Sequence, residues 1–235
     1  MQVSDLALVR GMGATRATLA RWNLAPGRVL LRWSIASLAV AGALLVAVWV
    51  VASSVTPDPT PQALIGLTTP PSAEDVLRIL HGNGLVLALH SFACLAGYLA
   101  GSSLPREAAR RRGAWRRIHD RAGPLAIAFV SGATLFSLTT QAYIIGSTAA
   151  TLSAQLGVSP ARLLAGFLPH ALLELWALFL PLAAWLLASR RRSWDELLAA
   201  TLVTTAIAIP SLVLAALVEV YVSPHLVAAL TGYYT

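Results

Sequence analysis

The sequence contains no lysine, a single cysteine and few charged residues. All 17 of its basic residues are arginine, and only 11% of its 235 residues are charged. A soluble domain usually carries about 25% charged residues, so this shortage excludes an ordinary soluble domain. Because Cys94 is alone, an internal disulfide framework and a thiolate metal cluster are excluded as well.

Several functional motifs are also missing. The sequence has no phosphate-binding loop, so any work that requires ATP would fall to another chain. It has neither the H-E-x-x-H pattern of zinc proteases nor the G-x-S-x-G pattern of serine hydrolases. We expect no cleaved signal peptide, because the first apolar run begins after 32 residues and is too long for a signal sequence.

Long apolar runs dominate what remains. Hydrophobic residues make up 57% of the chain, and its mean hydropathy is +0.71. A helix of about 20 apolar residues crosses the hydrocarbon core of a bilayer. Five runs meet this requirement, at roughly 33–53, 83–104, 124–148, 163–189 and 197–222. We therefore predict an all-α, polytopic membrane protein with about five transmembrane helices.

The arginines predict the orientation of these spans. With alternating spans, fifteen of the 17 arginines fall on one side of the membrane, and only Arg78 and Arg162 fall on the other. Basic residues accumulate on the cytoplasmic side, so we expect a cytoplasmic N-terminus and an extracytoplasmic C-terminus. The net charge of +7 therefore indicates membrane topology rather than binding to nucleic acid. The expected parts are a basic N-terminal segment (1–32), a five-span domain (33–226) and a short outer tail (227–235).

Two cytoplasmic segments have open interpretations. Residues 2–28 alternate arginines with apolar side chains, which fits either an amphipathic helix on the membrane surface or a solvated basic tail. The loop 105–123 reads as a short helix anchored by Trp115. It could receive a partner, or its charge could serve only to orient the chain.

The first outer loop, residues 54–71, is rich in proline and is expected to be extended. Ser72 and Asp75 have the spacing of a capping box, which opens a helix. We expect the sequence His81-Gly82-Asn83-Gly84 to break that helix before the second span.

The most informative polar residues are His170 and Glu174. Glu174 is the only formal charge between Arg162 and Arg190, inside a run long enough to span a bilayer. A carboxylate at that depth is costly unless it is neutral, paired or facing water, and so it indicates a functional site. Spaced four residues apart on a helix, the two side chains share one face.

Other polar residues are expected at a similar depth. In the predicted topology the outer half of the membrane also contains His81, Asn83, His90, Gln141 and Glu219. We infer a polar pocket that is open to the outside and lined by the second to fifth spans. Three roles are open: hydrogen bonding between helices, peptide or ion handling by protonatable carboxyl groups, or catalysis by His170 and Glu174. No cofactor is evident, although two histidines and Glu174 would suit a zinc ion.

Span two contains Gly97 and Gly101 in a G-x-x-x-G arrangement, which permits close approach of helices. We favour packing within the chain over self-association, and homo-oligomerisation stays open.

The segment PHALLELWALFLPLAAWLLA, followed by RRRSWDE and a last span ending LVEVYVSPH, resembles the stage II sporulation protein M family, also called DUF95. The resemblance covers roughly residues 33–226. The residues that match its pattern are Asn83, Gly146, His170, Glu174, Glu219 and Pro224. Ala171, Gly84 and Gln141-Ala142 depart from the pattern.

The resemblance implies two settings in the bacterial plasma membrane. In one, such a protein acts with a separate ABC-type ATPase in the maturation, export or immunity of hydrophobic peptides, as in circular bacteriocin systems. In the other, it is a non-catalytic scaffold that recruits cell-wall remodelling enzymes during sporulation. The short outer loops favour the first, because they leave little surface for large wall enzymes.

Overall fold

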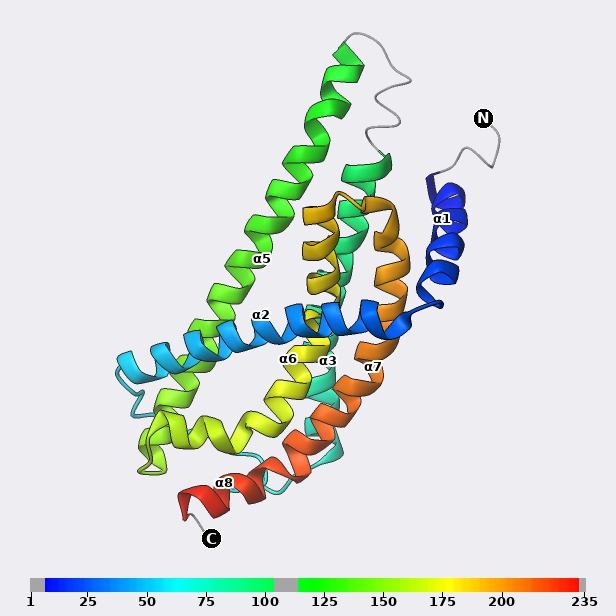
Figure 1. Ribbon diagram of the computed structural model, residues 1–235. Coiled ribbons are helices and arrows are strands. Elements are labelled where there is room, and N and C mark those ends of the chain that lie inside the picture. Colours follow the sequence, from blue (N-terminus) through cyan, green and yellow to red (C-terminus); the bar gives the residue numbers. More distant parts are fainter. Residues whose placement is uncertain (1–6, 104–113, 233–235) are drawn as a thin grey trace. The chain divides into compact units, whose positions relative to one another are not determined.

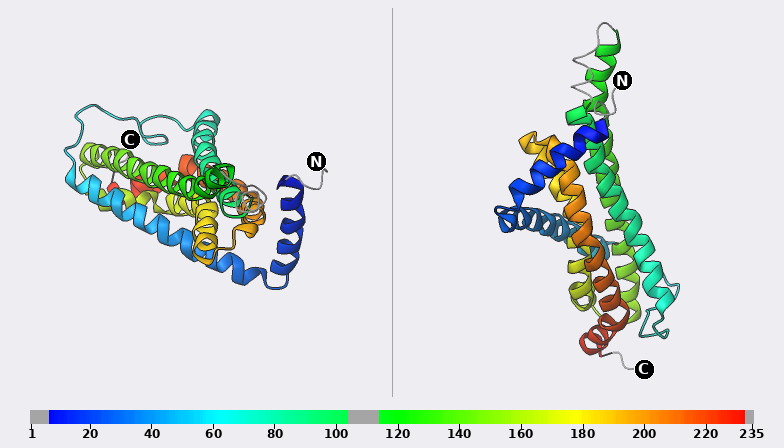
Figure 2. Two further views of the ribbon diagram at one scale, coloured as in Figure 1. Left: turned by 90° about the horizontal axis from the view of Figure 1, so that it is seen from above. Right: turned by 90° about the vertical axis from the view of Figure 1, so that its right-hand side faces the viewer.

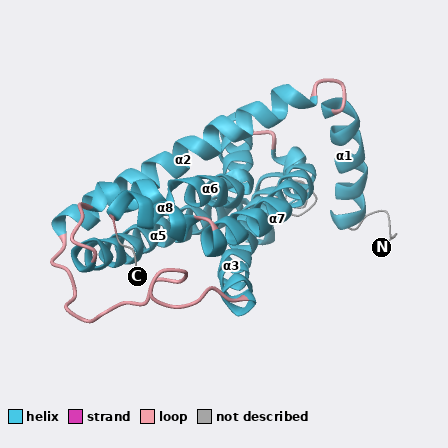
Figure 3. Cartoon of the chain, turned by 90° about the horizontal axis from the view of Figure 1, so that it is seen from below, coloured by secondary structure: helices cyan, strands magenta, loops and turns pink. Residues whose placement is uncertain are grey.

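The computed structural model describes residues 7–103 and 114–232, and nearly all of this part of the chain is helical (Figure 3). Its only β-type contact is an isolated bridge between Ile65 and Thr69. The predicted all-α class is confirmed. Helices are expected here because a bilayer core offers no water to hydrogen-bond with an open backbone.

Five long helices account for most of the chain (Figure 1). They are α2 (Pro26–Ser54), α3 (Ala73–Tyr98), α5 (Ala114–Gln155), α6 (Pro160–Arg191) and α7 (Leu197–Tyr221). Helix α1 (Ala7–Trp22) precedes them and α8 (Ser223–Thr231) follows. A short π-helix, η2 (Leu99–Ser103), extends α3, and a 3₁₀-helix, η3 (Trp194–Glu196), precedes α7. All five long helices are apolar enough to cross a membrane, which confirms the five predicted spans.

The chain divides into two compact units, and each long helix contributes one part to each unit. The first unit contains Met1–Ser37, Val86–Leu135 and Leu178–Ala208. The second contains Leu38–Leu85, Phe136–Ala177 and Ile209–Thr235. This division is the one expected for helices that alternate in direction. Arg78 and Arg162 belong to the second unit, whereas the arginine clusters near both ends of α1 and at the end of α6 belong to the first.

Local capping explains where α3 and α6 begin. The Asp75 backbone N–H donates to Ser72 Oγ (3.2 Å), and the Ser72 backbone N–H donates to Asp75 Oδ2 (3.1 Å), which confirms the predicted capping box. At α6, Pro160 occupies the first turn and the Arg162 backbone N–H donates to Ser159 Oγ (3.3 Å). The expected break at residues 81–84 is wrong, because α3 continues from Ala73 to Tyr98. Helical hydrogen bonding outweighs the propensity cost of two glycines there.

The sequence predicted an extended first loop, but part of this loop is folded into a turn. Residues 64–69 form a turn in which the Gly66 backbone N–H donates to the Thr69 carbonyl (2.7 Å) and the Leu64 N–H donates to Thr68 Oγ1 (2.8 Å). Leu64 is only 8% exposed, in a cluster of the second unit that includes Leu152, Leu163 and Val227. Burial of these apolar side chains outweighs the extended preference of the prolines.

The start of the same loop is held by polar contacts. The Asp58 backbone N–H donates to Thr151 Oγ1 of α5 (3.0 Å). The Thr60 N–H donates to Asp58 Oδ1 (2.8 Å), and this hydrogen bond lowers the pKa of the Asp58 carboxyl below its ordinary value. The loop is therefore tied to the second unit at both its start and its turn.

Within residues 2–28, the structure describes α1, which turns away from the start of α2 after a short connection (Figure 2). Arg21 of α1 forms an ion pair with Glu196 of η3 (2.6 Å). Residues 2–6 lie outside the described residues, and α1 is joined to the rest of the first unit by this ion pair. Of the loop 105–123, which is predicted to be cytoplasmic, residues 105–113 lie outside the described residues, and α5 begins at Ala114. Helix α8 extends into the predicted outer tail as far as Thr231.

Gly97 and Gly101 allow close packing inside the first unit. A Cβ atom on Gly97 would lie 2.8 Å from Trp185 Nε1, and one on Gly101 would lie 2.2 Å from Trp194 Cγ. Two indole rings therefore occupy the space that the glycines leave. In the structure both glycines pack within the chain, which is the favoured interpretation of this motif.

Candidate functional site

Helix α6 carries the candidate site and is the most enclosed of the five long helices. In its most apolar stretch 61% of residues are buried inside the protein, compared with 11% in α5. Polar side chains on α6 therefore have protein rather than lipid around them, as intramembrane ionisable residues require. Whether such a residue is structural or functional depends on its partners.

His170 is buried in the second unit and bonded to a serine. Its side chain is 8% exposed, and a hydrogen bond of 2.6 Å joins its Nδ1 atom to Ser223 Oγ at the start of α8. The ring of Phe167, one turn earlier on α6, contacts the imidazole edge to face at a centroid distance of 5.7 Å. These two contacts orient the imidazole and leave Nε2 available to other groups.

One turn further along α6, Glu174 meets polar groups from two other helices. The amide of Asn83 on α3 approaches its carboxyl group, although Asn83 Nδ2 is buried without a hydrogen bond of ordinary geometry among the described residues. Glu219 of α7 lines the same pocket as Glu174. Glu174 is therefore the meeting point of three helices of the second unit.

His170, Glu174 and Glu219 border a pocket of about 390 Å³ in the second unit. His170, Glu174 and Glu219 are its only ionisable lining residues within the part of the chain that the structure describes. The rest of the wall is apolar and includes Leu44, Leu45 and Val48 from α2, Leu64 and Ile65 from the first loop, and Ile145 from α5. Sites for small ligands are typically apolar pockets of about 300–1,000 Å³ with a few polar groups.

The other predicted site residues lie elsewhere. His81 is exposed on α3, and Gln141 Nε2 donates to Ser137 Oγ on its own helix (3.1 Å). His90 belongs to the first unit, where it is fully buried and its Nδ1 lies 2.8 Å from the Leu178 carbonyl oxygen. The structure thus brings together Asn83, His170, Glu174 and Glu219, but not these three residues.

Sequence reasoning missed Ser223 and the wall formed by the first loop. Ser223 directly precedes Pro224, which was itself part of the recognised pattern, so the helix start at α8 offered a signal for it. The loop wall depends on Gly66, whose φ of 78° places it against Pro224. No local pattern reveals that long-range contact.

A zinc ion would need several donor side chains close together. Within residues 7–103 and 114–232, no three His, Cys, Asp or Glu side chains are placed so that they could hold a metal ion. A structural or catalytic zinc site needs at least three such protein ligands. In this arrangement the described pocket residues do not form a zinc site.

One of the comparisons with known proteins gave a match, and it agrees with this architecture. Neither the curated proteins nor the solved structures gave a significant match. The family model of stage II sporulation protein M matches residues 35–224, which include all five long apolar helices in whole or in large part. Together with those helices, the match describes a multi-pass protein of the plasma membrane. The chain therefore belongs to the stage II sporulation protein M family.

Proposed function

We propose that this protein binds an apolar peptide segment in the pocket of the second unit and acts with a separate ABC-type ATPase in peptide maturation, export or immunity. The composition of the pocket is the observation that carries the proposal. An apolar wall surrounds three ionisable groups, His170, Glu174 and Glu219. Apolar side chains of a peptide would find the wall favourable, and its amines and backbone N–H groups would find acceptors.

The arrangement of the carboxyl groups supports a binding role over simple helix pairing. Glu174 and Glu219 are two acidic residues that line one pocket from two different helices. Such a pair favours a cation, a proton or a hydrogen-bond donor between them. His170 and Glu174 would then set the binding state of the site.

The charge distribution supports the proposed setting. The positive-inside rule places the arginine clusters of the first unit at the cytoplasmic face, where an ATPase would act. His170 and Glu174 would then lie in the outer half of the membrane. The first loop folds onto the second unit through Leu64, which leaves little free loop to dock a large wall enzyme.

Site-specific photo-cross-linking in native membranes would test the proposal. A benzoylphenylalanine at Ile145, which lines the pocket, is compared with one at Ile144, which is the same residue type and exposed like Ile145 but outside the lining. We expect a small apolar peptide adduct from position 145 that is absent or much weaker at position 144. Mass spectrometry identifies the adduct, and co-purification in mild detergent tests for a stoichiometric ATPase.

Two results would contradict the proposed function. Equal adducts at both positions would mean that the pocket has no particular affinity for peptide. Stoichiometric cell-wall hydrolases in place of an ATPase would favour the scaffold role instead. The polar residues of the pocket would then be assigned to interactions between helices.

A further inference from the structure

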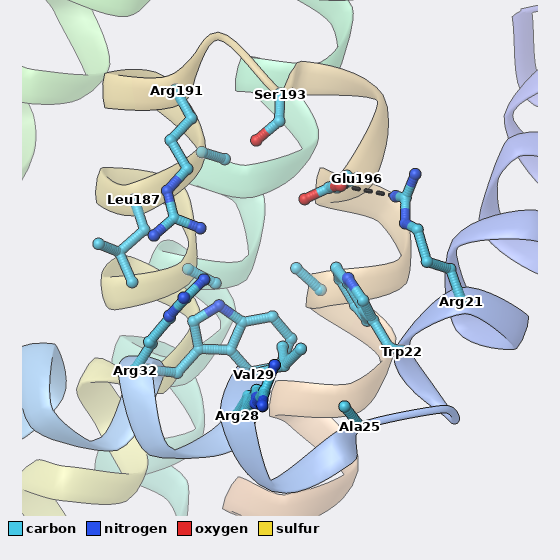
Figure 4. Close-up of a pocket in the computed structure, with 14 residues that line it drawn as sticks. Arg21, Trp22, Ala25, Arg28, Val29, Arg32, Leu187, Arg191, Ser193 and Glu196 are labelled. Carbon is cyan, nitrogen blue, oxygen red and sulfur yellow. Dashed lines mark hydrogen bonds and ion pairs between the residues drawn. The ribbon is translucent and has the colours of Figure 1, made fainter.

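A second pocket, of about 340 Å³, lies in the first unit and is lined by four arginines (Figure 4). Arg21 comes from the end of α1, Arg28 and Arg32 from the start of α2, and Arg191 from the end of α6. Glu196 of η3 is the only acidic residue that lines it within the described part of the chain. The pocket therefore carries a strong excess of positive charge.

That one carboxylate neutralises only one of the arginines. Glu196 is paired with Arg21 at 2.6 Å. No hydrogen bond or ion pair to the guanidinium groups of Arg28, Arg32 or Arg191 is found among the residues that the structure describes. In Figure 4 the side chains of Arg32 and Arg191 extend toward one another from two different helices. Guanidinium groups that converge without an acceptor suit a bound anion, and their planar forks match phosphate oxygens.

An apolar pocket of about 440 Å³ adjoins the arginine pocket. The two pockets share Trp22, Val29 and Trp33 in their linings. Trp22 and Trp33 pack edge to face with ring centroids 5.1 Å apart, so the shared wall is a fixed aromatic pair. Beyond it, Leu19 and Leu30 line the apolar side. An arginine-lined pocket and an apolar pocket thus stand side by side.

We infer that these two pockets form a binding site for one anionic glycerophospholipid. The phosphate would lie among Arg28, Arg32 and Arg191, and an acyl chain would lie against Leu19, Leu30 and the indole pair. A free phosphate would satisfy the arginines equally, but it would not use the adjoining apolar pocket. Basic pockets between spans on the cytoplasmic side are known to suit anionic headgroups. None of the residues of this lipid site lines the proposed peptide pocket.

The test measures lipid binding by the purified protein in detergent at fixed ionic strength. Native mass spectrometry is carried out with dioleoyl phosphatidylglycerol, dioleoyl phosphatidylcholine and inorganic phosphate. The triple variant Arg28→Gln, Arg32→Gln, Arg191→Gln is compared with a control of equal charge, Arg16→Gln, Arg190→Gln, Arg192→Gln, whose three residues are not in the lining. We expect phosphatidylglycerol to bind at least tenfold more tightly than phosphatidylcholine. This preference should disappear in the pocket variant and persist in the control.

Fluorescence provides a measurement on the folded wild-type protein. Phosphatidylglycerol with brominated acyl chains should quench the tryptophan emission more than brominated phosphatidylcholine does. The difference should shrink when Trp22 and Trp33 are both replaced by phenylalanine. Equal loss in the two arginine variants, or equal quenching by the two lipids, would overturn the lipid site. Full competition by millimolar inorganic phosphate, without any quenching, would overturn the lipid assignment and leave a phosphate site.

Discussion

The Nδ1 atom of His170 lies 2.6 Å from the Oγ atom of Ser223, and both side chains are buried. This hydrogen bond ties the middle of α6 to the start of α8, next to the candidate pocket. His170 therefore has a partner that also fixes which edge of the ring faces away from Ser223. Its role in the pocket depends on this orientation.

Ser223→Ala should lower the stability of the protein because it leaves a buried imidazole nitrogen without a partner. Such a loss costs about 1–3 kcal/mol, and about 1 kcal/mol lowers the Tm by roughly 2–4 °C in a chain of this size. Thermal unfolding in detergent measures the shift. Ser54→Ala is the control, because Ser54 is exposed and bonds only to Val50 of its own helix. Equal Tm values for the two variants would contradict this role.

Glu174→Gln and Glu219→Gln should weaken peptide cross-linking at position 145 while leaving the amount of protein in the membrane unchanged. The substitutions keep the shape of each side chain but remove its ability to hold a negative charge. Immunoblotting of membranes measures the protein, and mass spectrometry measures the adduct. Unchanged adducts in both variants would refute the site. A fall in protein amount alone would favour a structural role.

Gly66→Ala should destabilise the second unit. Gly66 has a φ of 78°, and a Cβ atom there would lie 2.4 Å from Pro224 Cγ. Both the backbone conformation and the contact oppose a side chain, with a combined cost of at least about 1–2 kcal/mol. Gly82→Ala, on an open face of α3, is the matched control and should not lower the Tm. Similar unfolding temperatures for the two variants would show that the loop is not held against Pro224.

Gly101→Leu should lower the Tm without changing the oligomeric state. The new side chain would meet the indole of Trp194 inside the first unit, and overpacking of this kind costs about 1–3 kcal/mol. Gly132→Leu, which adds the same atoms where nothing lies within 4 Å, serves as the control. Light scattering on the purified protein measures the oligomeric state and so separates packing within the chain from self-association. Loss of a dimer with an unchanged Tm would instead assign Gly101 to self-association.

A fusion of alkaline phosphatase after Thr235 should be active, because five spans and cytoplasmic arginines place the C-terminus outside. The enzyme folds only where its disulfides can form, on the outer side. A fusion after Arg192 should be inactive, since the arginines at the end of α6 are expected in the cytoplasm. Activity in the reverse pattern would invert the topology and move the candidate pocket to the cytoplasmic half.

Much of the site was visible in the sequence. Glu174 stands alone in a long apolar run, and a lone charge in such a run is a strong local signal. His170 follows from helical spacing, because residues four apart share a face. His90 shows the limit of this reasoning. Its depth could be estimated from the rise of the helix, but its direction depends on how α3 is rotated, which packing alone decides.

The first loop shows a second limit. Its prolines predicted an extended segment, whereas Gly66 packs against Pro224 and Leu64 forms part of the pocket wall. The free energy of that packing comes from residues nearly a hundred or more positions away, such as Leu152 and Pro224. A local sequence window does not contain these partners.

The sequence by itself determined the number of spans, the helical class and the uneven distribution of arginine, because each depends on composition within a short window. The tertiary structure decided which polar groups meet. Glu174 and Glu219 come from two helices, and only the rotation and approach of those helices bring their side chains to one pocket. Periodicity shows that a helix has a face but not which neighbour it meets, because that choice depends on side-chain packing between segments distant in the chain.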